Sequence, residues 1–149
     1  MRILGLDLGS RTLGIALSDS GENLALAKET FRFAQDDYDA AVDRTLEYID
    51  EYKIKEVVLG LPKHMNGDIG ERAQLSMEFK DVIESERDVK VILQDERLTT
   101  SMALKTSAFL GNSASKRKAT VDQLAAQNIL QDYLDRKKQN GWQDFYYWW

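Results

Sequence analysis

The sequence contains no cysteine and only one histidine, His64. Without cysteine the chain has no disulfide, no thiolate nucleophile and no cysteine-ligated zinc site, and this composition suits a reducing cytoplasm. A single histidine cannot build a histidine-rich metal site, and His64 lies in a turn-rich loop with no evident partner for a Ser–His–Asp triad. Any metal chemistry must therefore use carboxylates, which favour hard ions such as Mg²⁺ or Mn²⁺.

Long hydrophobic runs are also absent. The apolar N-terminal stretch 1–17 is interrupted by Asp7 and Arg11, whereas a signal peptide has an uncharged core and a membrane helix needs about 20 apolar residues. The 149 residues, 43% of them hydrophobic and 30% charged, have the size and composition of one globular domain. We therefore expect no membrane contact and a cytoplasmic location.

The net charge of −5 is unevenly distributed along the chain. Residues 35–56 contain eight acids against three bases, whereas residues 111–138 contain six bases against three acids. Solvated helix faces would explain either run on its own. Because acidic and basic residues are concentrated in different parts of the chain, the protein can nevertheless have one basic face although its net charge is negative.

Hydrophobic periodicity predicts three strands followed by alternating helices and strands. The expected strands are 2–8, 13–18, 24–33, 56–60 and 89–94, and the expected helices are 37–52, 70–86, 100–110 and 119–138. Short turns join the first three strands into an antiparallel meander, and intervening helices make the later strands parallel through right-handed crossovers. The expected fold is α/β, a mixed five-stranded sheet with helices on both faces. In helix 70–86 the residues expected to face the core are Leu75, Phe79, Val82 and Ile83.

Asp7 interrupts a strand that is otherwise suited to burial on both faces. An ionised carboxylate there costs several kcal/mol unless a cation, strong hydrogen-bond donors or a strand end compensates it. A metal ligand satisfies this condition. An aspartate that braces the turn at Gly9 would satisfy it as well.

Two further acidic positions occur where ligands can bind. Asp95 and Glu96 follow the strand 89–94, and in open α/β sheets ligands bind beyond the carboxyl ends of parallel strands. A turn brace or neutralisation by Arg97 is the simpler interpretation of this pair. Asp122 opens the last helix, where an acid commonly stabilises the helix N-terminus. If the three regions converge, Asp7, Glu96 and Asp122 could hold two divalent ions about 3.5–4 Å apart and clamp a phosphodiester for attack by water.

Four segments in order resemble the YqgF/RuvX family, the Holliday-junction-resolvase-like proteins with an RNase H-like fold. They are 7–19 (DLGSRTLGIALSD), 60–67 with 70–73 (GLPKHMNG and GERA), 95–100 (DERLTT), and 122–126 with 129–130 (DQLAA and IL). The first segment alone would also fit the phosphate-binding hairpin of actin-type and Hsp70-type ATPases. All four together are highly specific.

The resemblance implies a nuclease that is thought in this family to trim the 5′ end of precursor 16S ribosomal RNA. An older proposal for the family is a Holliday junction resolvase, so structured RNA is favoured over a DNA junction as the partner. By matching positions, Asp7, Glu96 and Asp122 would be the catalytic metal ligands for two Mg²⁺ or Mn²⁺ ions, with Asp7 bridging them. The residues implied in nucleic-acid binding are Arg11, Arg72, Arg97, Lys116, Arg117 and Lys118. Asp95 either serves as a fourth acid or the site has three.

The C-terminus departs from the family pattern. Six of the last eight residues are aromatic, so we expect a nuclease domain over 1–138 and an aromatic tail over 139–149. The tail could stack on unpaired bases, at roughly 1–3 kcal/mol per base, but folding back over a sheet edge or a dimer interface is the simpler interpretation. Monomer and homodimer both remain open. So does an RNA-binding module without turnover, which the low basicity favours and the intact set of acids opposes.

Overall fold

The computed structural model describes residues 1–61, 71–95 and 124–138. Its elements in chain order are β1 (Ile3–Leu8), β2 (Thr12–Ser18), β3 (Ala25–Arg32), α1 (Tyr38–Tyr52), β4 (Glu56–Leu61), α2 (Glu71–Glu86) and β5 (Lys90–Asp95). A further helix occupies 124–138 and is called the C-terminal helix below. The helix expected at 100–110 and the tail 139–149 lie outside the described residues. Within the described ranges, no helix is long and apolar enough to span a membrane.

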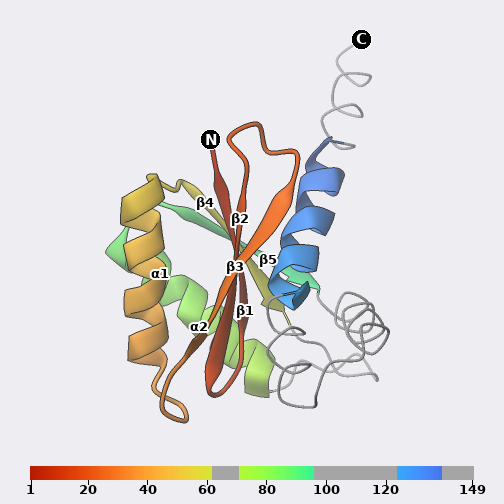
Figure 1. Cartoon of the computed structure of the whole chain (residues 1–149). Coiled ribbons are helices and arrows are strands. Elements are labelled where there is room, and N and C mark those ends of the chain that lie inside the picture. Colours follow the sequence, from red (N-terminus) through yellow and green to blue (C-terminus); the bar gives the residue numbers. More distant parts are fainter. Residues whose placement is uncertain (62–70, 96–123, 139–149) are drawn as a thin grey trace.

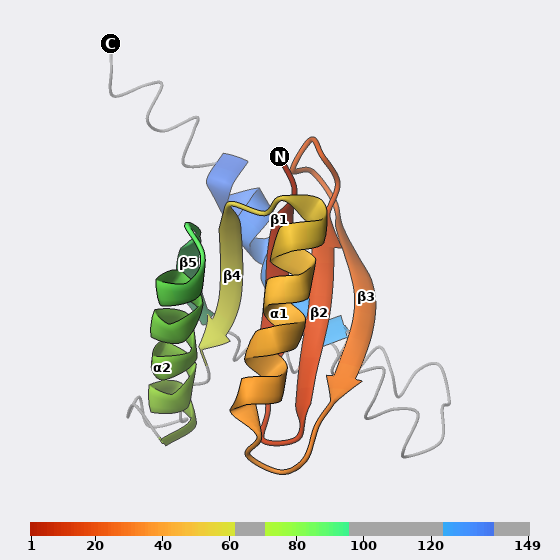
Figure 2. The same cartoon turned by 90° about the vertical axis from the view of Figure 1, so that its left-hand side faces the viewer.

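The strands form one mixed sheet in the order β3-β2-β1-β4-β5. β1 pairs with β2 and β2 with β3 in antiparallel fashion, whereas β1 pairs with β4 and β4 with β5 in parallel. α1 and α2 cover one face of this sheet and the C-terminal helix covers the other (Figures 1 and 2). The expected mixed sheet with helices on both faces is therefore confirmed.

The central strand β1 is apolar because it is buried on both faces of the sheet. Leu4 and Leu6 belong to the core under α1 and α2, while Ile3 belongs to the core under the C-terminal helix. Alternate residues of a strand point to opposite faces, so a strand between two helical layers must be apolar at nearly every position. Asp7 is the exception in this strand.

One expected core residue of α2 is wrong. Phe79 and Ile83 are buried as expected, but the side chain of Val82 is 43% exposed. The buried stripe of α2 instead includes Ala73 and Ser76. With 3.6 residues per turn, positions 76, 79 and 83 share one face, and position 82 lies roughly 100° away from 83.

The C-terminal helix runs antiparallel to β1. Tyr133 donates a hydrogen bond to Glu56, which pairs with Ile3 at the start of β1. Earlier in the helix, Ala126 and Leu130 lie over Gly5, where an added Cβ would come within 2.7 Å of the Leu130 Cβ and 3.2 Å of the Ala126 carbonyl oxygen. The missing side chain thus permits the close approach, and the N-terminal part of the helix extends toward the carboxyl end of β1.

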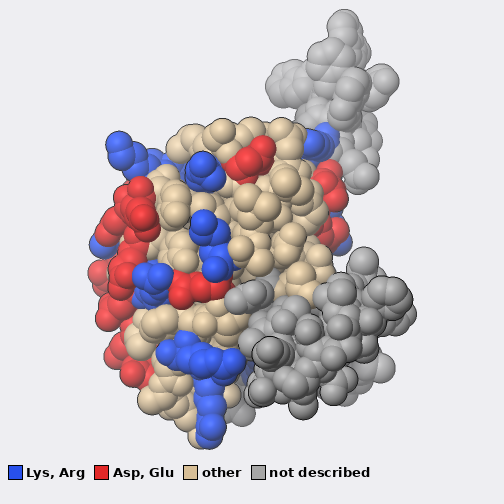
Figure 3. All heavy atoms as spheres, viewed as in Figure 1, with Lys and Arg blue, Asp and Glu red and all other residues tan. Residues whose placement is uncertain are grey.

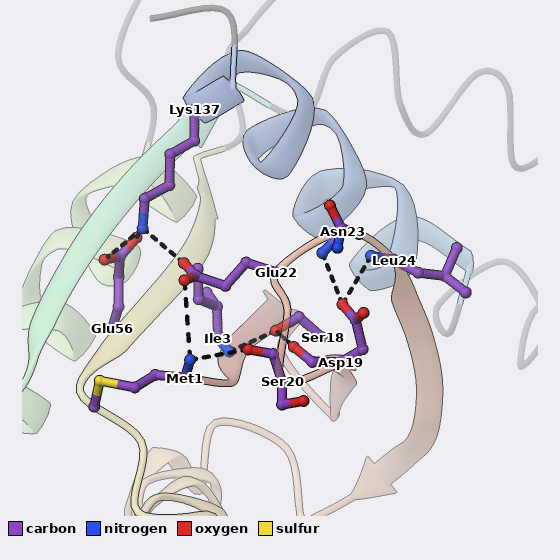
Figure 4. Close-up of polar contacts among 10 residues, drawn as sticks. All are labelled: Met1, Ile3, Ser18, Asp19, Ser20, Glu22, Asn23, Leu24, Glu56 and Lys137. Carbon is purple, nitrogen blue, oxygen red and sulfur yellow. Dashed lines mark hydrogen bonds and ion pairs between the residues drawn. The ribbon is translucent and has the colours of Figure 1, made fainter. Parts of the chain in front are cut away.

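Polar contacts anchor the far end of the C-terminal helix to the N-terminus of the chain (Figure 4). The Lys137 ammonium lies 2.8 Å from the Glu22 carboxylate and 3.4 Å from that of Glu56. The Met1 ammonium donates to the Ser20 carbonyl at 3.0 Å and lies 3.9 Å from Glu22. These contacts join the start of β1, the β2–β3 turn, the start of β4 and the helix at the end of the sheet opposite Asp7.

Candidate active site

The carboxyl ends of three strands meet at one edge of the sheet. In the parallel register Leu6 of β1 pairs with Leu59 of β4, and Leu61 at the end of β4 pairs with Asp95 at the end of β5. Asp7 follows Leu6, and Glu96 follows Asp95 in the sequence. This is the edge at which open α/β sheets bind ligands.

The Asp7 side chain lies on the face that the C-terminal helix covers. It alternates with Gly5, which contacts that helix, and the residue is partly buried. Its antiparallel partner on β2 is Gly14, which pairs in turn with Thr30 of β3. Gly14 therefore places no side chain between Asp7 and Thr30 on this face of the sheet.

Main-chain hydrogen bonds close the β1–β2 turn next to Asp7. The Gly9 N–H donates to the Thr12 carbonyl oxygen at 2.8 Å, which closes the turn through the main chain. The turn is also held from outside, because Phe33 N–H donates to the Arg11 carbonyl at 2.9 Å and Asp36 N–H donates to the Ser10 carbonyl at 2.8 Å. The turn is therefore closed by main-chain hydrogen bonds, and the role of the Asp7 carboxylate stays a prediction.

Two of the arginines implied by the resemblance lie near this edge. Arg72, at the start of α2, donates from Nη2 to the Leu8 carbonyl at 3.3 Å, so its guanidinium lies beside the residue that follows Asp7. Arg11, at the tip of the β1–β2 turn, is exposed and donates from Nη2 to the Gln35 side chain at 2.8 Å. Each guanidinium keeps further donors for a phosphate.

A hydrogen bond connects the end of β5 with the C-terminal helix. Gln94, whose side chain is 5% exposed, donates to the carboxylate of Asp132. Asp132 also lies 3.4 Å from the guanidinium of Arg136. The strand that leads into Asp95 is thereby fixed against the same helix that covers Asp7.

The remaining predicted site residues lie outside the described residues. They are Glu96, Arg97, Lys116, Arg117, Lys118 and Asp122, and His64 lies outside them as well. Within 1–61, 71–95 and 124–138, no three acidic, histidine or cysteine residues are grouped closely enough to hold a metal ion. Asp7 is the one predicted metal ligand that the described part of the chain contains, and its place at the strand end suits an oxygen-ligated ion.

Sequence reasoning missed one cation at this edge, Arg32. It pairs with Thr12 at the end of β3, on the same face of the sheet as Asp7. The cross-strand register that brings it beside the turn depends on a bulge between β2 and β3, and no pattern in a single strand reveals that register.

Comparisons with known sequences identify the family. The family model described as "RuvX: Holliday junction resolvase" matches residues 1–136. A protein of Bacillus subtilis (strain 168) named "Putative pre-16S rRNA nuclease" is 47% identical over 135 residues, which cover 91% of this chain and 98% of the relative. A protein of the same name from Geobacillus sp. (strain WCH70) is 44% identical over 138 residues, covering 93% of this chain and all of the relative.

Solved structures agree on the fold. The structure of Thermus thermophilus RuvC has a TM-score of 0.57 at 15% identity and covers 93% of this chain and 97% of RuvC. The fowlpox virus Holliday junction resolvase has a TM-score of 0.57 at 16% identity, covering 91% of this chain and 99% of the resolvase. At these identities the likeness shows the fold, which is the RNase H-like fold of RuvC-type resolvases. Together with the family match, it shows that this chain belongs to the RuvX/YqgF family of nucleases.

Proposed function

We propose that this protein is a metal-dependent phosphodiesterase that processes the 5′ end of precursor 16S ribosomal RNA. The observation that carries the proposal is the place of Asp7: a partly buried carboxylate at the carboxyl end of β1, on the edge where β4 and β5 also end. The names of relatives that are 44–47% identical over nearly their whole length support this substrate.

The proposed metal ligands are Asp7, Glu96 and Asp122. The donor set fits a hard cation, because the chain has no cysteine and a single histidine. Two Mg²⁺ or Mn²⁺ ions bound by these acids would supply an activated water and neutralise charge on the phosphate during hydrolysis. In this proposal Asp7 bridges the ions, and Asp95 is the candidate for a fourth acid.

The other residues of the site bind and orient the substrate. Arg72 is held beside the end of β1 by the Leu8 carbonyl, so it can donate to a phosphate oxygen next to Asp7 without first being ordered. Arg11 extends from the tip of the turn, and Arg97 is assigned to the same task. Lys116, Arg117 and Lys118 are assigned to binding the phosphate backbone of the substrate on either side of the cleaved bond. Replacing each of them should reduce the slope of log binding constant against log salt concentration by roughly 0.7–0.9.

The likeness of the fold to junction resolvases supports a second candidate, cleavage of four-way DNA junctions. A cleavage assay separates the two. A precursor RNA with the natural 5′ extension and a four-way DNA junction are each incubated with the protein in Mg²⁺, in Mn²⁺ and with a chelator. We expect cleavage of the RNA in either metal and none with the chelator. Cleavage of the junction alone would favour the resolvase, and binding of the RNA without cleavage would favour a binding module.

The same preparation tests two related expectations. The cysteine-free sequence suits action in the cytoplasm, which cell fractionation can check. Size measurement in solution will distinguish the monomer from the homodimer, both of which the proposed site allows.

A further inference from the structure

Exposed basic side chains lie on β3, at one edge of the sheet, and just before the central strand β1. β3 is the terminal strand of the sheet, and its Lys28 and Arg32 are exposed, as is Arg2 just before β1. In the view that faces this edge, Lys and Arg recur from the top to the bottom of the surface, with some acidic atoms between them, and most Asp and Glu lie on the left, over α1 (Figure 3). We refer to Arg2, Lys28 and Arg32 as the β3 strip.

At its upper end the strip brings two cations to one aromatic ring. The Arg2 Cζ lies 5.8 Å and the Lys28 Nζ 6.0 Å from the centroid of the Tyr52 ring. Lys28 reaches this position from a bulge, because Ala27 pairs with Ala16 and Glu29 pairs with Ile15, which leaves Lys28 unpaired between them. Both cations therefore lie beside one ring of α1 at the upper end of the strip.

At its lower end the strip reaches the candidate active site. Arg32 pairs with Thr12 on the face of the sheet that also carries Asp7, and Arg11 lies at the neighbouring turn. β3 contains eight residues, so at about 3.3 Å per residue the strand is roughly 25 Å long. Arg32 lies on the face that carries Asp7, whereas Lys28 lies beside Tyr52 of α1 on the other face. The strip thus crosses the edge of the sheet over four residues of β3, roughly 13 Å, which exceeds the spacing of neighbouring phosphates along a double helix.

The cations of the strip differ from several others in the described part of the chain, which neighbouring carboxylates neutralise. Arg44, Arg87 and Lys137 are each paired with a carboxylate. Arg2, Lys28 and Arg32 form no ion pair with any carboxylate in the described ranges. The ring of Tyr52 is already occupied by two of these cations, so the upper strip offers charge and no free aromatic face for an unpaired base.

We propose that the β3 strip binds the phosphate backbone of a double-helical arm of the substrate, extending the interface beyond the active site. This inference rests on the proposed function, because it takes a nucleic acid as the partner. A double helix presents its backbone and keeps its bases stacked inside, which matches a surface of cations without free aromatic rings. The competing explanation is that the edge lysine and arginines only prevent edge-to-edge pairing of β3 between molecules.

The test compares two triple variants with the same change in net charge. The strip variant is Arg2→Gln, Lys28→Gln and Arg32→Gln. The control is Lys53→Gln, Lys55→Gln and Lys90→Gln, three exposed lysines that precede β4 or begin β5 and also lack ion pairs with described carboxylates. Binding to a duplex RNA with a short 5′ overhang, and to a single-stranded RNA of the same length, is measured from 50 to 300 mM salt in Ca²⁺. Thermal melting and light scattering check folding and association.

We expect the strip variant to lower the salt slope on the duplex by roughly 2, about 0.7–0.9 for each phosphate that is no longer neutralised, while the control changes it little. A charge-preserving variant, Arg2→Lys with Arg32→Lys, should retain most of the slope. Equal salt slopes for the strip and control variants would overturn the inference. If the strip variant also self-associated, the basic residues of β3 would serve to prevent pairing of that edge strand between molecules. If the strip variant bound only the single-stranded RNA more weakly, the proposal that the strip binds a double-helical arm would be overturned. Wild-type protein that binds duplex RNA through the strip but does not cut the precursor RNA in Mg²⁺ or Mn²⁺ would refute the proposed nuclease function and would still support the strip.

Discussion

Gly5 is the residue on which the seating of the C-terminal helix depends most. An added Cβ would lie 2.7 Å from the Leu130 Cβ, which is close to the helix backbone and cannot swing away. We expect Gly5→Ala to lower the free energy of unfolding by about 1–3 kcal/mol, measured by urea denaturation. Leu130→Gly removes the opposing Cβ, so the double variant should be less destabilised than the sum of the two single variants. A Gly5→Ala protein as stable as the wild type would show that the helix lies farther from β1.

The stability of the β2–β3 turn depends on pH through the carboxylate of Asp19. Its carboxylate accepts from the Leu24 N–H at 3.0 Å and the Asn23 N–H at 2.7 Å (Figure 4), and these bonds lower its pKa below the ordinary value. Because the folded-state pKa is the lower one, this stabilisation is complete above the unfolded pKa of about 3.9 and is lost as the pH falls through the folded value.

The corresponding variant is Asp19→Asn, compared with wild type by thermal melting between pH 7 and pH 2.5. We expect the variant to melt lower at pH 7 and the two curves to converge below about pH 4. Asp36→Asn serves as the control. Among the described residues, the Asp36 carboxylate accepts no pair of main-chain hydrogen bonds like that of Asp19. A difference in melting temperature that stays constant down to pH 2.5 would contradict the role of the Asp19 charge.

At the scale of elements, the C-terminal helix is fastened at the end away from the site. Tyr133 donates to the Glu56 carboxylate, and both burial and this bond raise its pKa. Tyr133→Phe removes one charge-assisted hydrogen bond and should cost about 1–2 kcal/mol of unfolding free energy, measured by urea denaturation at pH 7. Cleavage per folded molecule should remain near the wild-type rate, because the change lies at the opposite end of the sheet from Asp7. A large drop in cleavage at full folding would show that this anchor also positions the site.

Elements that are buried on both faces were predictable from the sequence. β1 and β4 lie within two residues of the expected strands because nearly every position in them is apolar. Helix faces were harder to predict: Val82 was expected in the core and is exposed, because short runs of apolar residues do not define one stripe. The bulge at Lys28 and the place of Arg32 depend on cross-strand packing, which no single segment encodes.

The candidate site could be predicted only in part. Asp7 is noticeable in the sequence because a charge in an apolar strand is costly, and the structure places it at the expected strand end. Arg72 was assigned only through the resemblance; its guanidinium donates to the Leu8 carbonyl, and its role in nucleic-acid binding stays a prediction. The roles of Glu96 and Asp122 remain predictions, since both lie outside the described residues.

For the molecule as a whole, metal binding should raise the thermal stability of the folded protein. A ligand that binds only the folded state stabilises it in proportion to the logarithm of its concentration. We expect millimolar Mg²⁺ or Mn²⁺ to raise the melting temperature of the wild-type protein and to leave that of Asp7→Asn nearly unchanged. Ca²⁺, which also takes oxygen ligands, provides a second probe that does not depend on turnover. Equal shifts in both proteins would place the ion away from Asp7.

The most direct test is the rate of RNA cleavage by Asp7→Asn in Mg²⁺, measured beside its affinity for the same RNA in Ca²⁺. Asparagine keeps the shape of the side chain but removes the charge that would hold the ions. We predict a fall in cleavage by orders of magnitude with binding retained, and a melting temperature without metal that is level or higher, because a poorly solvated charge is gone. Cleavage within a few-fold of the wild-type rate would contradict the assignment of Asp7 as a catalytic metal ligand.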